Sequence, residues 1–316
     1  MDLNEDKLGI QSEDFKQLKS APIDFFFHIA ALTDFRNTPS ITDALRRTNV
    51  YGTQQTLQLA SSLGVNEFCF VGSAYSCGTA SGIISPDYIN LKQSFRNPYE
   101  LSKLEAEILV RNFAKKTGMR CRYFRPSTIC GRLIEPALGA INKFDVFYAW
   151  AVFFFQMKLK NLKTGKDKYK DPINFEIRIC CNPKSGLNLV PADYAAKVIY
   201  QVCLQKDSGE NYYLANNQET LHSLCITLIL ETLNIQGAKL METIPDQMNV
   251  LEQLYYRTAG KIYTPYMSSE PMLFDVGNLN NILRTAKLQC PPVDRKNFLI
   301  LMDYAKKHNF GLNVQE

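Results

Sequence analysis

The sequence lacks a long hydrophobic run and a signal peptide. Its most apolar window, residues 146–157, is about half as long as a helix must be to span a bilayer. The first residues, MDLNEDKLGIQSED, are acidic and polar, unlike the apolar core of a secretory leader. We therefore expect a soluble, cytoplasmic protein without a transmembrane segment.

The chain also lacks paired cysteines and a strong excess of charge. Its nine cysteines form no CxxC pair, so we expect reduced thiols and no metal site, rather than a zinc ribbon or a disulfide scaffold. A net charge of +5 over 316 residues is too mild to indicate nucleic-acid binding. With 46% hydrophobic and 21% charged residues, the chain has the composition of a globular protein and not of a disordered tail.

Strand and helix signals alternate along the first half of the chain. Short apolar runs at 23–27 and 68–71 and the alternating run 120–125 each predict a strand, the first followed by His28. Repeated strand–helix–strand units at this spacing predict a parallel sheet with helices on both faces.

Two helices have clear end signals. One is expected to begin at Ser40, with Asp43 as its capping-box-like partner, and to end at Gly64. The other is expected from Asn97, its N-cap, to Gly118.

Tyr99 and Lys103 form a YxxxK pair inside the second helix. Four residues apart, they lie on one helical face, where the lysine ammonium is expected to lower the phenol pKa from about 10. Such a phenol can pass a proton to a carbonyl oxygen during reduction. Ser73 follows a strand, where its hydroxyl can bind a substrate oxygen. The alternative for the YxxxK pair is two solvated side chains.

Ser73, Tyr99, Lys103 and the helical Asn49 together resemble the catalytic set of the extended short-chain dehydrogenases/reductases. The runs FHIAALTDF, NVYGTQQTL, FVGSAYSCG, NPYELSKLEAE, YFRPSTICGR, LNLVPADYAAKVI and LFDVGNLNNIL resemble the fatty acyl-CoA reductase and thioester reductase branch, with its male sterility-type NAD-binding domain. The resemblance covers nearly the whole chain. It implies an α/β fold with a Rossmann-like, doubly wound parallel sheet, incomplete at its N-terminus, and a smaller C-terminal substrate lobe.

This resemblance implies NADPH-dependent reduction of an acyl thioester, carried by coenzyme A or a carrier protein, to an aldehyde or alcohol. By this resemblance, Ser73 and Tyr99 would polarise the thioester carbonyl, and Lys103 would hold the nicotinamide ribose. Asn49 would support a water that relays a proton; alternatively, its side chain could hydrogen-bond to the backbone. NADP is expected over NAD from the resemblance alone. It places the cofactor against Asp2, Leu3, His28, Ala30, Ala31, Tyr99, Lys103 and Pro126, and the substrate against Ser73, Ala74 and Thr128.

The expected organisation has four parts: residues 1–131 as a partial NADP-binding domain, 132–188 as mainly substrate lobe, 189–215 as a return to the sheet, and 216–316 as the C-terminal substrate lobe. The aromatic stretch 144–155 could line an acyl tunnel, but core packing is favoured. The lysine-dense stretch 158–170 could bind coenzyme A phosphates or an acidic carrier protein; a solvated charge run is favoured.

The family's TGxxGxxG loop, which holds the pyrophosphate at a helix N-terminus, has no counterpart here. The chain aligns from the family's GDL element, so two βα units of about 30 residues each would precede it. We therefore expect strand 23–27 to be an open apolar edge, and NADPH binding, hence activity, to be weak in residues 1–316. A nucleotide-sugar epimerase or dehydratase, against which NLVPADY counts, and a non-catalytic interaction protein are the alternatives. A homo-oligomer is compatible with each reading.

Overall fold

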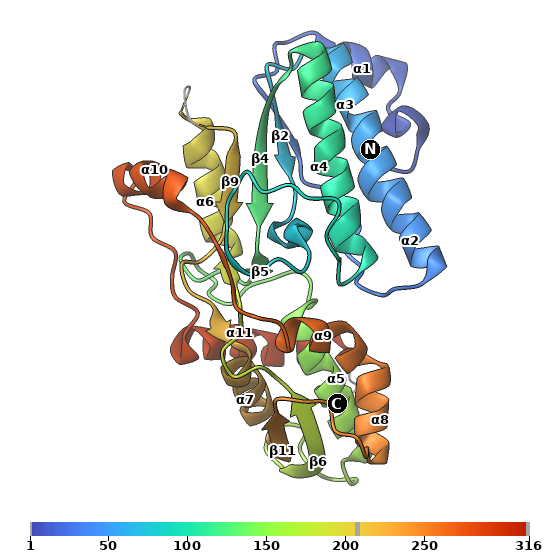
Figure 1. Ribbon diagram of the computed structural model, residues 1–316, viewed down its shortest axis with the longest axis vertical. Coiled ribbons are helices and arrows are strands. Elements are labelled where there is room, and N and C mark those ends of the chain that lie inside the picture. The colour runs from blue at the N-terminus through green and yellow to red at the C-terminus, as the bar shows by residue number, and fades with distance from the viewer. Residues whose placement is uncertain (1, 206–208, 314–316) are drawn as a thin grey trace.

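A four-stranded parallel sheet organises the first lobe of the molecule. The structure is a computed structural model that describes residues 2–205 and 209–313 (Figure 1). The strands lie in the order β1-β2-β4-β9 and every neighbouring pair is parallel. Their bounds are β1 (Phe25–His28), β2 (Glu67–Val71), β4 (Arg120–Pro126) and β9 (Asn211–Leu214).

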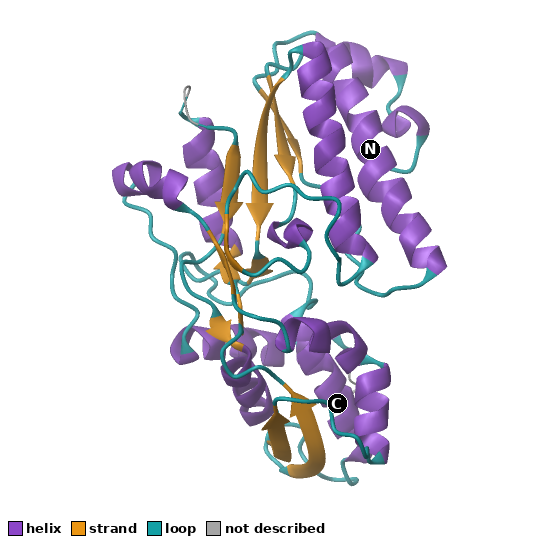
Figure 2. Cartoon of the chain, in the orientation of Figure 1, coloured by secondary structure: helices purple, strands orange, loops and turns teal. Residues whose placement is uncertain are grey.

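Helices cover both faces of this sheet, as predicted. α3 (Gly52–Leu63) and α4 (Pro98–Thr117) pack on one face, and α6 (Ala192–Cys203) packs on the other. Along β2, Phe68 and Phe70 face α3 and α4, whereas Cys69 faces α6, because successive side chains of a strand point to opposite faces. The doubly wound, Rossmann-like parallel fold is therefore confirmed (Figure 2).

Of the two helix starts predicted from sequence, one is confirmed and the other is wrong. Asn97 caps α4 by accepting the Glu100 N–H at 3.1 Å, as predicted, and Gly118 ends it at φ 75°. The predicted start at Ser40 is wrong: Thr38 is the N-cap of α2 (Pro39–Leu45), because its hydroxyl, not that of Ser40, accepts the Ile41 N–H. A π-helical turn, η2 (Arg46–Tyr51), then joins α2 to α3.

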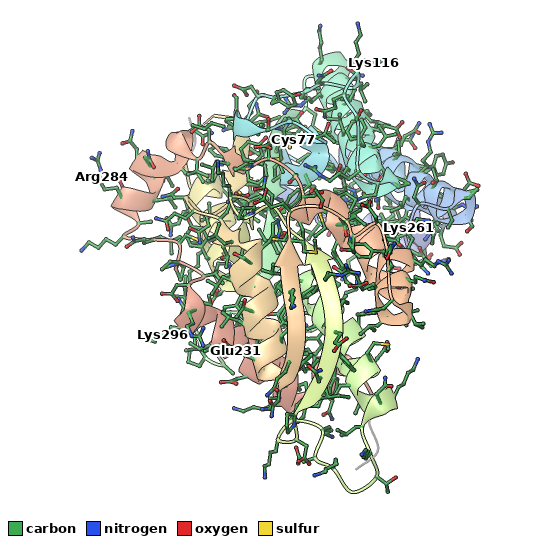
Figure 3. The ribbon with its side chains drawn as sticks, turned by 60° about the horizontal axis from the view of Figure 1, so that its bottom comes forward. Cys77, Lys116, Glu231, Lys261, Arg284 and Lys296 are labelled. Atoms are coloured by element: carbon green, nitrogen blue, oxygen red, sulfur yellow. The ribbon has the colours of Figure 1, made fainter. Side chains whose placement is uncertain are left out.

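The second lobe is built mainly of helices around one parallel strand pair, β6 (Ile173–Cys180) and β11 (Ile235–Met241). In Figure 3 these two strands lie in front, with Glu231 near the end of α7. The aromatic stretch forms much of this lobe's core, through Trp150, Phe154 and Phe155. The helices are α5 (Phe147–Asn161), α7 (His222–Thr232), α8 (Val250–Arg257), α9 (Ala259–Met267) and α11 (Arg295–Lys307).

Part of the C-terminal region returns to the sheet lobe. β12 (Met272–Phe274) pairs with β3 (Gly82–Ile84), and α10 (Asn280–Thr285) lies beside α6 (Figure 1). The division expected from sequence places all of 216–316 in the C-terminal lobe; apolar residues of α10 instead pack in the core cluster of α6. Short pairs join β5 (Thr128–Cys130) to β8 (Leu189–Pro191) and β7 (Gly186–Leu187) to β10 (Thr220–Leu221).

β1 is an outer strand of the sheet. Phe25 and Phe27 on it are 37% and 42% exposed, which makes the open apolar edge that the sequence predicts. None of the helices in the described parts of the chain is both long and apolar enough to cross a membrane.

Candidate active site

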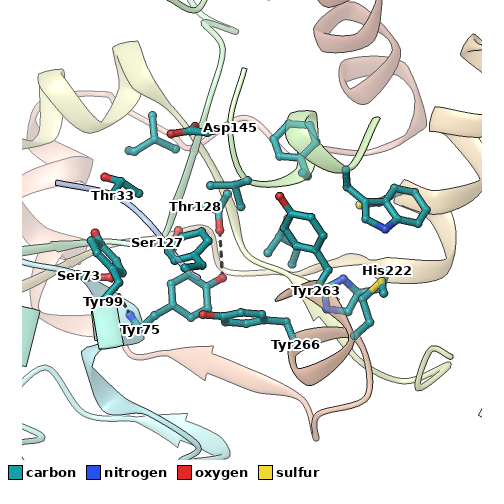
Figure 4. A pocket seen from close by; sticks show the side chains of 18 of the residues that line it. Thr33, Ser73, Tyr75, Tyr99, Ser127, Thr128, Asp145, His222, Tyr263 and Tyr266 are labelled. Atoms are coloured by element: carbon teal, nitrogen blue, oxygen red, sulfur yellow. Dashed lines mark hydrogen bonds between the residues drawn. The ribbon is translucent and has the colours of Figure 1, made fainter. Parts of the chain in front are cut away.

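A cavity of about 230 Å³ lies where the carboxyl ends of β2 and β4 meet the second lobe (Figure 4). This is where open parallel sheets place their ligand sites. Its sheet-side wall includes Thr33, Phe35, Gly72, Ser73, Tyr75, Tyr99, Pro126, Ser127 and Thr128. Its opposite wall includes Asp145, Phe147, Trp150, Leu187, His222, Cys225, Ile226, Ile229, Tyr263, Tyr266 and Met267.

The structure brings Ser73 and Tyr99 together in the cavity wall, although they come from different elements. Ser73 follows β2, and its Oγ accepts the Tyr75 N–H at 3.2 Å. Tyr99 lies in the first turn of α4 and lines the cavity with Ser73 and Thr33, whose hydroxyls lower the pKa of its phenol in part. Two hydroxyl groups therefore face the same end of the cavity, where they can hold one carbonyl oxygen.

The pKa of Tyr99 differs from the expectation. Burial raises it to about 12, and the hydroxyls of Ser73 and Thr33 lower it only in part. The predicted lowering toward neutral pH by Lys103 is wrong in this structure, because desolvation of the phenolate, joined by the negative charges of Asp145 and Glu100, raises the pKa instead. Tyr99 is thus a neutral hydrogen-bond donor at pH 7.

Lys103 lies outside the cavity wall, beneath the end of β2. Its Nζ donates to the Val71 carbonyl at 2.8 Å and lies 5.1 Å from the centre of the Phe70 ring. Burial lowers the pKa of Lys103 to about 8, while the charge of Glu107 one turn later opposes that shift. The ammonium donates only this one recorded hydrogen bond in the described part of the chain, and Lys103 is 4% exposed.

Asn49 ties the loop after β1 to α4. Its Oδ1 accepts the Leu32 N–H at 2.8 Å, and its Nδ2 donates to the Leu32 carbonyl and the Ser102 hydroxyl, both at 3.0 Å. The residue lies in the π-helical turn η2, a feature often found near functional sites. These contacts favour the backbone-bonding alternative over a proton relay.

His28 does not reach the cavity. Its Nε2 pairs with the Thr53 hydroxyl at 2.8 Å, and burial lowers its pKa to about 3. Alternation along β1 turns Phe26 and His28 toward α3, so His28 is absent from the cavity lining, and its contact with a cofactor stays a prediction.

The other expected site residues are scattered. Pro126 and Thr128 line the cavity, but Ala74 is buried in a neighbouring apolar cluster. Ala30 is exposed and Ala31 half-buried in the loop that leads to the cavity residues Thr33 and Phe35. Asp2 is exposed and bonds Asn4, while Leu3 packs against Gly52, so the structure records no contact of either residue with the cavity lining.

The lysine-dense stretch lies at the far end of α5. That helix begins at the cavity with Phe147 and Trp150, and Asn161 is about 16 Å further along its axis. Lys158 is buried and donates to the carbonyls of Asp171 and Leu233. A role for this stretch in gripping coenzyme A phosphates at the cavity has no support here.

Sequence reasoning missed the aromatic and histidine side chains of the second lobe. Tyr266 and His222 reach the cavity from α9 and α7, far along the chain from Ser73. No spacing motif marks them. Trp150 had a signal, since it lies within the aromatic stretch that the sequence places in the core or in an acyl tunnel. It belongs to the core of the second lobe and also lines the cavity.

The residues fit one half of a nicotinamide dinucleotide. The Tyr99 hydroxyl and the ring of Pro126, both in the cavity lining, suit a nicotinamide ribose at the ends of β2 and β4, whereas the Lys103 ammonium is buried outside that lining. The turns after β1 and β2, at 29–38 and 72–73, lack a glycine-rich helix N-terminus for a pyrophosphate among the described residues.

Comparison with known proteins identifies the family. A model described as "Male sterility protein", for an NAD-binding domain, matches residues 1–199. The chain belongs to this family. This family agrees with the resemblance of the sequence to the extended short-chain dehydrogenases/reductases, in their thioester reductase branch.

Individual relatives agree with this family. The chain is 24% identical over 317 residues to a linear gramicidin synthase of Brevibacillus parabrevis; the match covers 96% of this chain but 6% of that protein. The fold matches the terminal R domain of the myxalamid PKS-NRPS pathway with TM-score 0.73 and 21% identity, covering 100% of this chain and 76% of the other. It also matches the thiolation-reductase di-domain of an archaeal non-ribosomal peptide synthetase, with TM-score 0.67, 18% identity and coverages of 98% and 61%.

Proposed function

We propose that this male sterility family chain carries the reducing site of an acyl thioester reductase. The substrate is an acyl group on coenzyme A or a carrier protein, the product an aldehyde or alcohol, and the reductant NADPH. The observation that carries the proposal is the Ser73–Tyr99 hydroxyl pair at one end of a largely apolar cavity. An apolar wall suits an acyl chain better than a sugar nucleotide, which needs many polar partners.

In this proposal Ser73 and Tyr99 bind the thioester carbonyl oxygen through their hydroxyls. Tyr99 stays protonated at neutral pH, so it can donate a hydrogen bond to the oxygen as negative charge develops there. The surrounding apolar residues exclude water and strengthen that hydrogen bond. The carbonyl carbon gains a hydride, the C–S bond breaks as the C=O bond of the aldehyde re-forms, and the leaving thiolate takes a proton from solvent. A second hydride and a second proton would convert the aldehyde to the alcohol.

Lys103 and Pro126 form the part of the site that a nicotinamide ribose would occupy. When bound, the reduced nicotinamide supplies the hydride. The ammonium donors of Lys103 suit the ribose hydroxyls, and its bond to Val71 keeps the side chain in place at the end of β2. Asn49 holds the loop that carries Thr33, which lines the cavity together with Tyr99.

The test is a thioester reduction assay on the full chain, with octanoyl-CoA and millimolar NADPH because weak cofactor binding is expected. Both NADPH oxidation and thiol release are followed. Tyr99→Phe should lower kcat by roughly 10²-fold or more. Ser73→Ala should also lower kcat, but by a smaller factor, because the Tyr99 hydroxyl remains as a donor.

Tyr200→Phe is the matched control, since Tyr200 is 61% exposed on α6 and should leave the rate unchanged. Wild-type rates in both site variants would contradict the proposal. So would thiol release that does not need NADPH, because that outcome is hydrolysis.

A further inference from the structure

His222 is a buried polar side chain at the end of the cavity opposite Ser73 and Tyr99 (Figure 4). It is the first residue of α7 and is 6% exposed. Ile226 and Ile229, further along α7, line the same wall. The imidazole is thus a polar group in mostly apolar surroundings, which native interiors tolerate when it is hydrogen-bonded.

The imidazole has hydrogen-bonding capacity that the protein leaves unused. Burial lowers the pKa of His222 to about 4, so the ring is neutral at pH 7 and carries one N–H donor and one acceptor nitrogen. Its ring interacts with the Tyr266 backbone carbonyl, which can take only the N–H. The hydrogen bonds recorded among the described residues include no donor to the second nitrogen.

The cavity also limits the size of what it can hold. An apolar protein cavity of ~150 Å³ accommodates benzene, so about 230 Å³ holds an acyl group of roughly nine non-hydrogen atoms. A long-chain fatty acyl group has nearly twice that number and would leave much of its length outside.

We infer that the acyl group bound here is compact and carries a hydrogen-bond donor, a hydroxyl or an N–H, near its far end, where His222 accepts it. This inference rests on the proposed function, since it places the thioester carbonyl at Ser73 and Tyr99. The apolar residues between the two ends then contact the body of the acyl group. Specificity follows because an acyl group without the donor leaves the buried nitrogen unpaired.

Trp150 allows a direct test without cofactor, because it is the chain's single tryptophan and it lines the cavity. The full chain is titrated with the CoA thioesters of octanoic, 7-hydroxyheptanoic and hexadecanoic acids. Binding is followed by tryptophan fluorescence and by calorimetry. Octanoyl and 7-hydroxyheptanoyl groups have equal numbers of non-hydrogen atoms, so they differ only in the terminal hydroxyl. The hydroxylated thioester should bind about tenfold more tightly than the octanoyl thioester.

Variants of His222 test whether this residue causes the preference for the hydroxylated thioester. His222→Leu should abolish the preference by weakening only the hydroxylated thioester. His222→Asn, whose amide oxygen can still accept, should keep part of it. His308→Leu is the control, since His308 is exposed at the end of α11.

Equal affinity for the two matched thioesters, an unchanged preference in His222→Leu, or tightest binding of the hexadecanoyl thioester would each overturn the inference while leaving the proposed function standing. Binding of no acyl thioester at all would overturn both.

Discussion

Glu107 is a buried carboxylate that holds α4 against the sheet. Its two oxygens accept the Arg125 Nε and Nη2 at 2.8 and 2.6 Å, and Oε1 also accepts from Arg111. Burial alone would raise the pKa of Glu107, but the two arginines lower it below its ordinary value. Since Glu107 lies one turn from Lys103 and opposes the lowering of its pKa, it also helps keep that lysine charged.

We expect Glu107→Gln to destabilise the fold by about 3–5 kcal/mol, because it leaves the Arg125 guanidinium buried without a counter-charge. Urea unfolding measures the change. Glu105→Gln, on the same helix, removes a half-exposed partner of Arg46 at 3.6 Å and should cost under about 1 kcal/mol. Similar losses of stability in both variants would show that the buried Glu107–Arg125 pair stabilises the fold no more than the exposed pair does.

At the scale of single elements, Asp193 connects α6 to the loop after β5. Its carboxylate accepts the N–H groups of Ile134 and Glu135, both at 2.8 Å, and that of Tyr194 at 3.0 Å. The sequence run NLVPADY therefore has a physical function in this fold: it fixes the course of the loop that continues toward the cavity residue Asp145.

Glu219 connects β7 to β12 in a pH-dependent way. Burial raises its pKa to about 7, and hydrogen bonds from the Gly186 and Met272 backbones oppose that rise. Because the folded chain holds this proton more tightly than the unfolded chain, whose glutamate pKa is about 4.3, the stabilising contribution is complete below that pH and is lost as the pH rises to 7.

Glu219→Gln should therefore flatten the pH dependence of stability, with a change on the order of 1 kcal/mol between about pH 4 and 7 after allowance for solvent screening. Unfolding in urea at several pH values measures it. The exposed Glu210→Gln should keep the wild-type profile. Parallel profiles for wild type and Glu219→Gln would contradict the prediction.

These elements also show which parts of the fold and of the site can be predicted from the sequence. α4 was predictable because its N-cap, its proline and Gly118 are all local signals, and the strands because each is a short apolar or alternating run. Ser73 and Tyr99 followed from a local motif. The direction of the His28 side chain could not be predicted, because the facing of a strand depends on its neighbours. His222 was missed because tertiary packing alone brings α7 to the cavity.

At the scale of the whole molecule, Tyr266 joins the second lobe to α4. Its hydroxyl donates to the carboxylate of Glu100, the residue after Tyr99, at 2.8 Å and accepts from the Asn97 amide at 2.6 Å. Its ring packs edge-on against Tyr75 in the cavity. The second-lobe wall of the cavity and the helix that carries Tyr99 therefore share one side chain, so a shift of either lobe moves both.

Tyr266→Phe removes this link while keeping the ring. We expect a loss of about 1–3 kcal/mol of stability, because Asn97 loses its acceptor and the buried Glu100 loses a donor. Tyr256→Phe is the matched control: its hydroxyl also has a donor and an acceptor, Cys180 and Arg178, but all three residues lie in the second lobe. Both variants should lose similar stability in urea unfolding.

Only Tyr266→Phe should also weaken binding of the thioester reported by Trp150, by roughly tenfold, because only that link spans the cavity. If instead both variants bind the thioester like wild type, the lobes hold their relative position through the pairing of β3 with β12 and the packing of α10 on α6. The Tyr266 hydroxyl would then contribute to stability without orienting the site.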